Sequence, residues 1–237
     1  MELSVVIPVF NEEKRIWKTL SRLSGYLKRH FSSWEIIVVD DGSSDRTKEI
    51  LSTAAERVRV IRNETNHGKG SAVRQGILAA EGEWIFFTDA DLSTPTLEIG
   101  KFVELFRARD AEVLIGSRSI PGSVIKIRQA CYRQNMGRIF NWFVKRLTPL
   151  RFQDTQCGFK GFTREAARKI FSCATKNGFA FDVEILLLAR NFAFKVKEVP
   201  VTWVNNSKSK VRPITDSARM FRELLEVRNI DLKQEGE

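Results

Sequence analysis

The sequence predicts an α/β protein in which helices flank a mostly parallel sheet. Short apolar runs alternate with segments whose apolar residues recur at helical spacing, and this alternation is typical of right-handed β-α-β units. Acidic residues follow two of the expected strands, and glycine-containing turns follow two of them. Open parallel sheets bind ligands beyond the carboxyl ends of their strands, so the pattern indicates a nucleotide-binding architecture.

The run Trp84–Thr88 leads directly into Asp89, Ala90 and Asp91. If the strand persists to its end, residues two apart point to the same side, and both carboxylates project together beyond the sheet. Such a pair repels itself unless a cation or donor lies between the two groups, and Mg²⁺ and Mn²⁺ favour oxygen ligands. The pattern therefore predicts a metal site, with a simple Asp pair capping the next helix as the alternative.

The first half of the chain divides into four strand–helix units. Expected strands occupy residues 3–8, 35–39, 58–61 and 84–89. The helix after the first strand carries apolar residues at near-helical spacing, and Asn11 is the residue we expect to cap it. Asp40 and Asp41 end the second strand, and a helix then runs to about residue 55; the glycine-rich turn 66–71 leads into a helix through residue 78, and another helix spans about 93–109.

The second half is less regular. We expect a strand at 111–116 that ends at Arg118, helices at 164–174 and 182–191, and a strand at 195–204. Residues 152–162 are rich in turn formers, residues 205–212 form a basic loop, and a last helix spans about 213–228. We find no internal repeat or linker, so the prediction is one domain over residues 1–230 and a charged, frayed tail at 231–237.

The net charge of +10 suggests an anionic partner such as a nucleotide, a phospholipid surface or nucleic acid. No Asp or Glu occurs between Val113 and Gln153, while eight basic residues fall there. Within this acid-free span, apolar and basic residues interleave over residues 125–147. This pattern is typical of a basic amphipathic helix that lies on an anionic bilayer. Packing of its apolar stripe on the protein's own core is an equally good interpretation. Nucleic-acid binding is disfavoured because no reader motif accompanies the charge.

Several classes of protein are excluded by what the sequence lacks. The three cysteines have no metal-ligand spacing, and neither His30 nor His67 stands beside a partner. No G-x-G-x-x-G follows the first strand and no G-K-[ST] loop occurs, which argues against dinucleotide oxidoreductases and P-loop enzymes. No run approaches the ~20 apolar residues of a membrane span and no signal peptide is evident, so we expect a cytoplasmic protein.

Several segments together resemble the inverting family 2 glycosyltransferases, whose GT-A fold is a Rossmann-like nucleotide-diphospho-sugar transferase fold. Within that family the chain is similar to the dolichyl-phosphate β-glucosyltransferases and the polyprenyl-phosphate mannosyltransferases. The resemblance runs in the family's order from residue 3 to about residue 212. The matching segments are Val5–Glu12, Val38–Asp45, Asn66–Gly70, Asp89–Asp91, Gly116–Arg118 and Asp154–Lys160.

The resemblance implies a role for each matching position. The residues of the nucleotide-sugar donor site would be Pro8, Phe10, Glu12, one carboxylate of Asp40 and Asp41, Lys69, Asp89 and Ala90. Asp89 and Asp91 would hold Mg²⁺ or Mn²⁺ on the diphosphate. Arg118 and Arg133 would face the acceptor phosphate, and Ser209–Lys210 looks like the family's mobile loop.

The activity implied is transfer of a hexose from a nucleotide sugar to a polyprenyl or dolichyl phosphate, with UDP-glucose the first choice and GDP-mannose the second. Ser93 stands where many mannosyl-phosphate synthases carry glutamine, which weakens a mannose-specific interpretation. Membrane association would be peripheral, at the cytoplasmic face. Two alternatives remain: a family 2 transferase that uses Asp154 as general base on a sugar hydroxyl, and a non-catalytic module that binds nucleotide sugars or a membrane surface.

Overall fold

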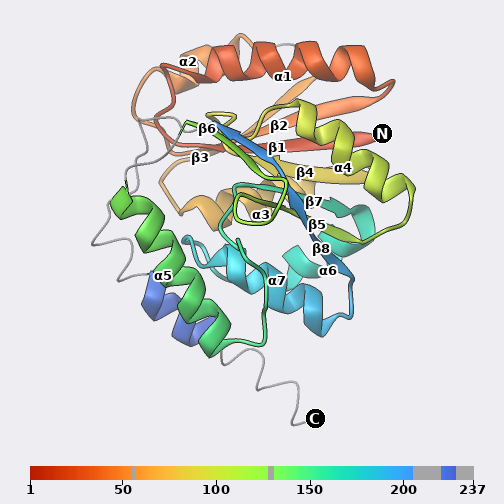
Figure 1. The fold of residues 1–237 in the computed structure, drawn as a ribbon. Helices are drawn as coiled ribbons and strands as arrows, with labels where there is room; N and C mark the ends of the chain where they lie inside the picture. Colours follow the sequence, from red (N-terminus) through yellow and green to blue (C-terminus); the bar gives the residue numbers. More distant parts are fainter. Residues whose placement is uncertain (55–56, 128–130, 205–219, 228–237) are drawn as a thin grey trace.

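The computed structural model describes residues 1–54, 57–127, 131–204 and 220–227. For residues 131–135 it describes the backbone alone. A seven-stranded sheet forms its centre (Figure 1). In spatial order the strands are β3 (Val58–Asn63), β2 (Trp34–Asp41), β1 (Leu3–Val9), β4 (Trp84–Thr88), β7 (Phe159–Thr163), β5 (Val113–Ser117) and β8 (Val196–Pro200). Only the pairings of β7 with β4 and β5 are antiparallel. The prediction of a mostly parallel sheet is confirmed.

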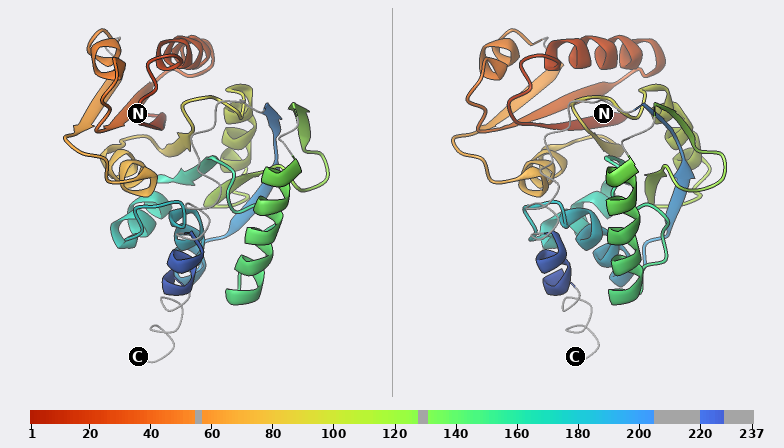
Figure 2. Two further views of the ribbon diagram at one scale, coloured as in Figure 1. Left: turned by 90° about the vertical axis from the view of Figure 1, so that its left-hand side faces the viewer. Right: turned by 60° about the vertical axis from the view of Figure 1, so that its left-hand side comes forward.

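Helices cover both faces of this sheet, as Figures 1 and 2 show. One face carries α1 (Ile16–His30), α2 (Thr47–Ser52) and α4 (Leu97–Arg107). The other carries α3 (Lys69–Ala79), α6 (Arg164–Cys173) and α7 (Phe181–Asn191), with α5 (Cys131–Leu147) and the helical residues 220–227 beside them.

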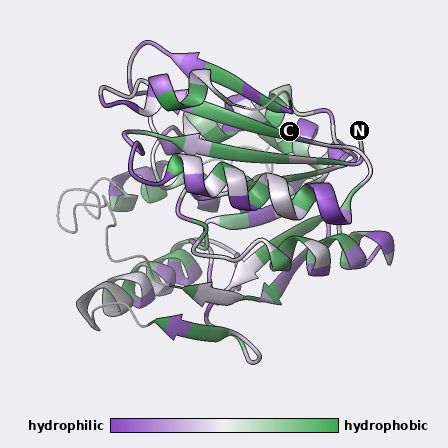
Figure 3. Ribbon diagram, turned by 90° about the horizontal axis from the view of Figure 1, so that it is seen from above, coloured by the Kyte–Doolittle hydropathy of each residue, from purple (hydrophilic) through white to green (hydrophobic). Residues whose placement is uncertain are grey.

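The hydropathy of the elements explains this layering. The central strands are apolar on both sides, whereas the outer helices alternate polar and apolar residues along their length (Figure 3). In β1, Val6 enters the core beneath α3, and Val5 and Ile7 enter the core beneath α1. A strand that is buried on both faces needs helices on both, and each helix contributes one apolar stripe.

Three stretches differ from the sequence-based prediction. Residues 124–127, expected in part to begin the basic helix, instead form β6 (Val124–Ile127), which pairs with β9 (Thr202–Val204) in a second small sheet. β-branched residues dominate β6 and favour a strand once a partner is present. The helix therefore begins only at Cys131.

The turn-rich stretch 152–162 contains the second difference, because its last four residues belong to β7, in the middle of the sheet. Glycine in a strand usually weakens a strand prediction, but Gly161 has a packing reason. A Cβ atom there would lie 2.7 Å from the ring of Phe86. The strand contains glycine because the aromatic core of β4 presses on it.

The third difference is that residues 195–204 form two strands rather than one. The break falls at Val201, whose N–H donates to Ser117 in the main sheet and whose carbonyl accepts from Val124 in the small sheet.

Asn11 does not cap α1, contrary to the prediction from the sequence. Its φ is 55° and its side-chain oxygen accepts hydrogen bonds from the backbone of Ser44 and Asp45, so it ties the first loop to the second.

The predicted last helix is described only at residues 220–227, which are helical; the rest of it and the predicted tail 231–237 lie outside the described residues. None of the described helices combines the length and apolar character that crossing a bilayer requires.

The aromatic cluster under β4 provides a test of this core. The fully buried ring of Phe86 lies 5.8–6.2 Å, between centroids, from the rings of Phe102, Phe106 and Phe159. We expect Phe86→Ala to lower the free energy of unfolding by ~3–5 kcal/mol, because it removes a large side chain and leaves a cavity. Urea denaturation measures this; the control, Leu97→Ala, alters a side chain that is 70% exposed and should change stability by less than ~0.5 kcal/mol.

Candidate active site

The functional residues meet at one edge of the sheet because β7 runs antiparallel to its neighbours. The carboxyl end of β4 pairs Thr88 with Phe159, at the amino end of β7. The residues just before β7 are therefore brought beside the residues just after β4 and β5. Three segments far apart in the sequence, beginning at Asp89, Arg118 and Asp154, form one site for this reason.

Asp89 and Asp91 lie close together, but through a turn rather than a continued strand. β4 ends at Thr88, and the turn is closed by a hydrogen bond from the Leu92 N–H to the Asp89 carbonyl, 3.1 Å. Leu92 adopts a left-handed backbone, φ 47°, which non-glycine residues rarely do. Thr19 on α1 donates to the carbonyl of Ala90, which anchors the turn from the other side.

Each carboxylate of the pair faces a cation of the protein. Lys69 Nζ lies 2.6 Å from Asp89 Oδ1, and Arg15 Nη1 lies 3.8 Å from Asp91 Oδ2. Burial and the nearby charge of Asp89 raise the pKa of Asp91, although hydrogen bonds from Ser93 partly oppose this. Burial lowers the pKa of Lys69, but the charges of Asp89 and other carboxylates outweigh it, so this pKa lies above its usual value.

The residues present fit a divalent cation that shares its coordination with a substrate. The Asp89 side chain is 40% exposed, and a Cβ atom at Gly158 would lie 1.9 Å from its Oδ2, so only glycine leaves that oxygen its space. In the described part of the chain no group of three or more acidic, His or Cys residues could hold a metal alone. Mg²⁺ is commonly bound by one or two carboxylates together with substrate phosphates, which matches this donor set.

The glycine turn before α3 is held rigidly against its neighbours. Both oxygens of Asp41 accept backbone hydrogen bonds from His67, and one also accepts from Gly68, at 2.8–3.1 Å. Gly70 donates to the carbonyl of Asn177, and a Cβ atom at Gly68 would lie 2.4 Å from that same oxygen. Asp41 thus positions the turn that carries Lys69.

The remaining donor-site residues predicted from the sequence lie at the ends of β1 and β2. Pro8 belongs to β1, and beyond it Phe10 is 39% exposed. Glu12 pairs with Arg15 at 2.7 Å. Asp40 is buried; its Oδ1 accepts from the backbone of Ser43, while among the described residues its Oδ2 has no hydrogen-bond partner.

Arg118 and Asp154 form a two-point ion pair. Arg118 donates from Nε and Nη2 to the two Asp154 oxygens at 2.7 and 2.9 Å, and its backbone N–H adds a third bond. Burial raises the pKa of Asp154, but the charge and hydrogen bonds of Arg118 outweigh it and hold the pKa below its usual value. A carboxylate held in this way is a weak base, so the geometry favours a positioning role for Asp154.

Two further residues support this ion pair, and the sequence did not indicate them. Glu198 on β8 accepts hydrogen bonds from the backbone N–H groups of Gln153 and Asp154 at 2.8–3.0 Å. The Trp203 ring on β9 lies beneath the Arg118 guanidinium, whose central carbon is 5.5 Å from the ring centroid. No local pattern marks either residue, because both act through strand pairing with distant segments.

A second buried ion pair, Lys160 with Asp182, was likewise not indicated by the sequence. Both side chains are almost completely buried, and the Lys160 ammonium donates to Asp182 and to the carbonyl of Cys157. Burial raises the pKa of Asp182, with Lys160 and Lys69 opposing it. The pair fastens α7 to β7.

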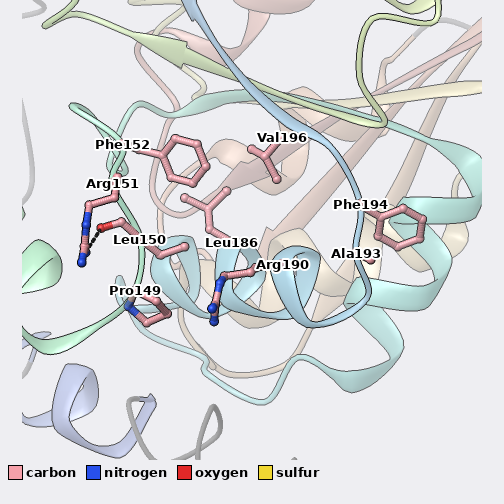
Figure 4. Close-up of a pocket in the computed structure, with 9 residues that line it drawn as sticks. All are labelled: Pro149, Leu150, Arg151, Phe152, Leu186, Arg190, Ala193, Phe194 and Val196. Atoms are coloured by element: carbon pink, nitrogen blue, oxygen red, sulfur yellow. Dashed lines mark hydrogen bonds between the residues drawn. The ribbon is translucent and has the colours of Figure 1, made fainter.

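Three predicted residues lie outside this geometry. Ser209 and Lys210 fall outside the described residues, as does the side chain of Arg133, which is near the start of α5. A cavity of about 440 Å³ lies elsewhere, between α7, the start of β8 and the segment after α5 (Figure 4). It is mainly apolar, with Leu186 and Phe194 among its walls, and none of the predicted site residues lines it.

With this geometry established, comparison with known proteins identifies the family. The model of "Glycosyl transferase family 2" matches residues 4–171. The chain belongs to this family. It is a glycosyltransferase, and its sheet and helices have the GT-A fold predicted from the sequence.

Named relatives are similar over most of the chain. A protein from Dictyostelium discoideum named dolichyl-phosphate beta-glucosyltransferase is 33% identical, over 95% of this chain and 73% of its own. Proteins of the same name from Saccharomyces cerevisiae and Homo sapiens are 35% and 34% identical, over 95% and 96% of this chain and 74% and 75% of their own.

Solved structures show the same fold. Glucosyl-3-phosphoglycerate synthase from Mycobacterium tuberculosis, in complex with Mn²⁺, UDP and glucosyl-3-phosphoglycerate, aligns with a TM-score of 0.73. It is 19% identical, and the alignment covers 96% of this chain and 80% of that one. A complex of the same enzyme with Mg²⁺ and UDP aligns with a TM-score of 0.73 at 20% identity, over 96% of this chain and 79% of that one.

The ion pair of Arg118 and Asp154 gives the site a testable pH dependence. Because the pKa of Asp154 is lowered on folding, the pair stabilises the protein above the ordinary Asp pKa of about 3.9 and loses that effect as pH falls through the lower folded value. We expect Asp154→Asn to cost ~3 kcal/mol near neutral pH, since Arg118 then lacks its buried partner.

Urea denaturation of both proteins from pH 6 to pH 3 measures this difference. It should be constant down to about pH 5 and shrink toward pH 3. Asp110→Asn is the control, because Asp110 also pairs with lysines but at the surface, and the change should have little effect. A difference that stays constant down to pH 3 would contradict the role assigned to the pair.

Proposed function

We propose that this glycosyltransferase moves a hexose from a nucleotide sugar to a polyprenyl or dolichyl phosphate with the help of a divalent cation. The observation that carries the proposal is the pair Asp89 and Asp91 at the carboxyl edge of the sheet, where Gly158 leaves room for the carboxylate of Asp89, which is 40% exposed. The names of the relatives from three eukaryotes support the acceptor.

Asp89 and Asp91 would hold the cation, Mg²⁺ or Mn²⁺, as both ions are named in complexes of the M. tuberculosis enzyme. When bound, such an ion neutralises the negative charge that grows on the departing diphosphate. Ser93 keeps Asp91 in place through its backbone N–H, 2.9 Å from Oδ1, and Thr19 fixes the intervening Ala90. The chain's own contribution is to hold both carboxylates in position.

The donor would lie across the ends of β1 and β2. Phe10 offers an exposed ring against which a base can pack, and Pro8 and Glu12 flank it. One of Asp40 and Asp41 accepts a hydrogen bond from the base. UDP-glucose is the first choice, because the relatives carry the name of glucosyltransferases and Ser93 replaces the glutamine typical of mannosyl enzymes; GDP-mannose is the second.

The acceptor needs positioning more than deprotonation, because a phosphate monoester is already largely ionised near neutral pH, with a second pKa of about 6. Arg118 is suited to such positioning, because Asp154 orients it through Nε and Nη2 and the pair does not use Nη1. A guanidinium matches two phosphate oxygens at once. Arg133 is the second arginine proposed to face the acceptor, and Lys210 is proposed to close over the site.

The acceptor's lipid chain requires a membrane surface, and we propose that α5 supplies the contact at the cytoplasmic face. One side of α5 packs inward through Phe143 and the fully buried Val144. On another side Ile139 and Trp142 are 56% and 60% exposed. Exposed apolar residues on a basic helix are typical of peripheral attachment to anionic lipid. The helical residues 220–227 lie alongside α5 (Figure 2). The ring of Phe221 contacts the ring of Phe143 edge to face, with 4.9 Å between the centroids.

Transfer to lipid tests the reaction directly. The protein is incubated with polyprenyl phosphate, Mn²⁺ and each radiolabelled nucleotide sugar in turn, and the lipid is then extracted and counted. We expect label from UDP-glucose, and we expect Asp91→Ala to abolish it while the circular dichroism spectrum is unchanged. Glu104→Ala, at an exposed carboxylate on α4, is the matched control and should retain activity.

Two results would contradict the proposal in different ways. If the label appeared in a soluble glycoside rather than in the lipid, the proposed acceptor would be wrong. If Asp91→Ala kept full activity in the presence of a chelator, the proposed role of the metal would be wrong.

Flotation with liposomes tests the membrane surface. Vesicles that contain anionic phospholipid should carry the protein upward at low salt, and less of it at high salt, because surface attraction is screened beyond about 8 Å at physiological ionic strength. Trp142→Ala should weaken binding severalfold, whereas Trp17→Ala, an equally exposed tryptophan on α1, should not. Equal loss in both variants, or no binding at any salt concentration, would show that α5 does not contact lipid.

A further inference from the structure

One of the two carboxylates proposed to hold the cation already has a close partner in the protein. Asp89, the more exposed member of the pair, has Lys69 Nζ at 2.6 Å, a full charge-assisted hydrogen bond. Asp91 has Arg15 at the longer distance of 3.8 Å, and Arg15 is shared with Glu12 at 2.7 Å. A cation that binds here must therefore displace one ammonium group, and that group belongs to Lys69.

The backbone at Lys69 cannot move to allow this, but its side chain can. Gly68 and Gly70 on either side are hydrogen-bonded to Asp41 and Asn177, and Cβ atoms on them would lie 2.4 and 2.3 Å from neighbouring carbonyl oxygens. The Lys69 side chain remains 21% exposed, and a lysine stem carries four flexible carbons. Exchange of partners is thus confined to one side chain swinging from a fixed point.

Asp182 is the next carboxylate that acts on the charge of Lys69, and it cannot readily accept the displaced ammonium. Asp182 is buried and bonded to Lys160, whose side chain is fully buried as well. Lys160 is further fixed by the carbonyl of Cys157, 2.8 Å away. Breaking that pair would leave a buried charge alone, which is costly. The favourable new partner is an anion that arrives with the cation.

We infer that Lys69 is an exchangeable counterion, which holds Asp89 when the site is empty and moves to the diphosphate when a cation and a nucleotide enter together. This inference rests on the function proposed above. Such an exchange makes the cation and the nucleotide bind cooperatively. The cation alone meets the positive charge of Lys69, and the nucleotide alone meets the negative charges of Asp89 and Asp91. By linkage the two affinities change by the same factor, commonly ~5- to 150-fold for coupled sites.

Binding of Mn²⁺ and UDP to the full chain tests the inference without any transfer. Free Mn²⁺ is followed by electron paramagnetic resonance with and without UDP, and UDP binding is followed by calorimetry with Mn²⁺ present. Lys69→Met keeps the apolar stem and removes the charge. We expect it to bind Mn²⁺ alone about tenfold more tightly than the wild type, to bind UDP about tenfold more weakly, and to lose most of the cooperativity.

Two variants separate this effect from simple damage. Lys69→Arg restores the charge and should recover much of the cooperativity. Lys195→Met is the matched control. Lys195 also pairs with an aspartate, Asp110, but it lies just before β8 and away from the site, so this variant should behave like the wild type. Thermal unfolding of all variants confirms that they remain folded.

The outcomes distinguish the inference from the function on which it rests. If Lys69→Met binds Mn²⁺ alone no more tightly than the wild type, the counterion inference is overturned while the donor site stands. If both affinities fall in Lys69→Met and Lys69→Arg alike, Lys69 is only structural, and the inference is again overturned. If the wild type binds neither Mn²⁺ nor UDP, both the inference and the proposed metal and donor are wrong.

Discussion

The antiparallel insertion of β7 between β4 and β5 is the constraint on which the rest of the site depends. A purely parallel sheet would place only the carboxyl ends of its strands at this edge. Because β7 enters from the same edge, the segment before it, from Asp154 to Gly158, is delivered beside Asp89 and Arg118. Two glycines make this placement of β7 and its preceding segment possible. Gly161 allows β7 to approach the Phe86 ring, and Gly158 allows the segment before β7 to approach the Asp89 carboxylate.

Charge at this edge is arranged in pairs, and each pair joins two elements. Lys69 joins α3 to the turn after β4, Arg118 joins the end of β5 to the start of the β7 segment, and Lys160 joins β7 to α7. A charge in a partly dry site is tolerated only when it is compensated, so these pairs let the protein assemble a strongly charged site before any ligand is present. The pairs differ in burial. The Lys160 pair is sealed and structural, whereas the Lys69 pair is partly open to solvent and able to change partners.

The same contrast between buried and exposed side chains distinguishes the proposed binding surface of α5 from the side that packs on the core. The proposed membrane side of α5 uses residues that the core leaves exposed, Ile139 and Trp142, while Val144 on the same helix is fully buried. The two interpretations that the sequence allowed for this helix are therefore compatible, because each concerns a different side of it. None of the predicted site residues lines the apolar cavity beside α7.

The sequence by itself determined the features that depend on neighbours along the chain. The parallel strands, their order in the chain, the Asp pair after β4 and the glycine turn before α3 follow from local runs, periodicity and turn chemistry, because those signals act within about ten residues. Family membership could also be predicted, since its motifs are short and contiguous.

Only the tertiary structure decided which distant residues meet. β7, the split between β8 and β9, and the strand at β6 require partners far away in the sequence, and strand propensity depends strongly on such partners. The pairing of Asp154 with Arg118, which favours a positioning role over that of a general base, and the pairing of Lys160 with Asp182 could not be predicted from local patterns. The physical reason is that burial and ion pairing are set by topology: a charge acquires its partner, and a carboxylate its pKa, only when the sheet brings separate segments together.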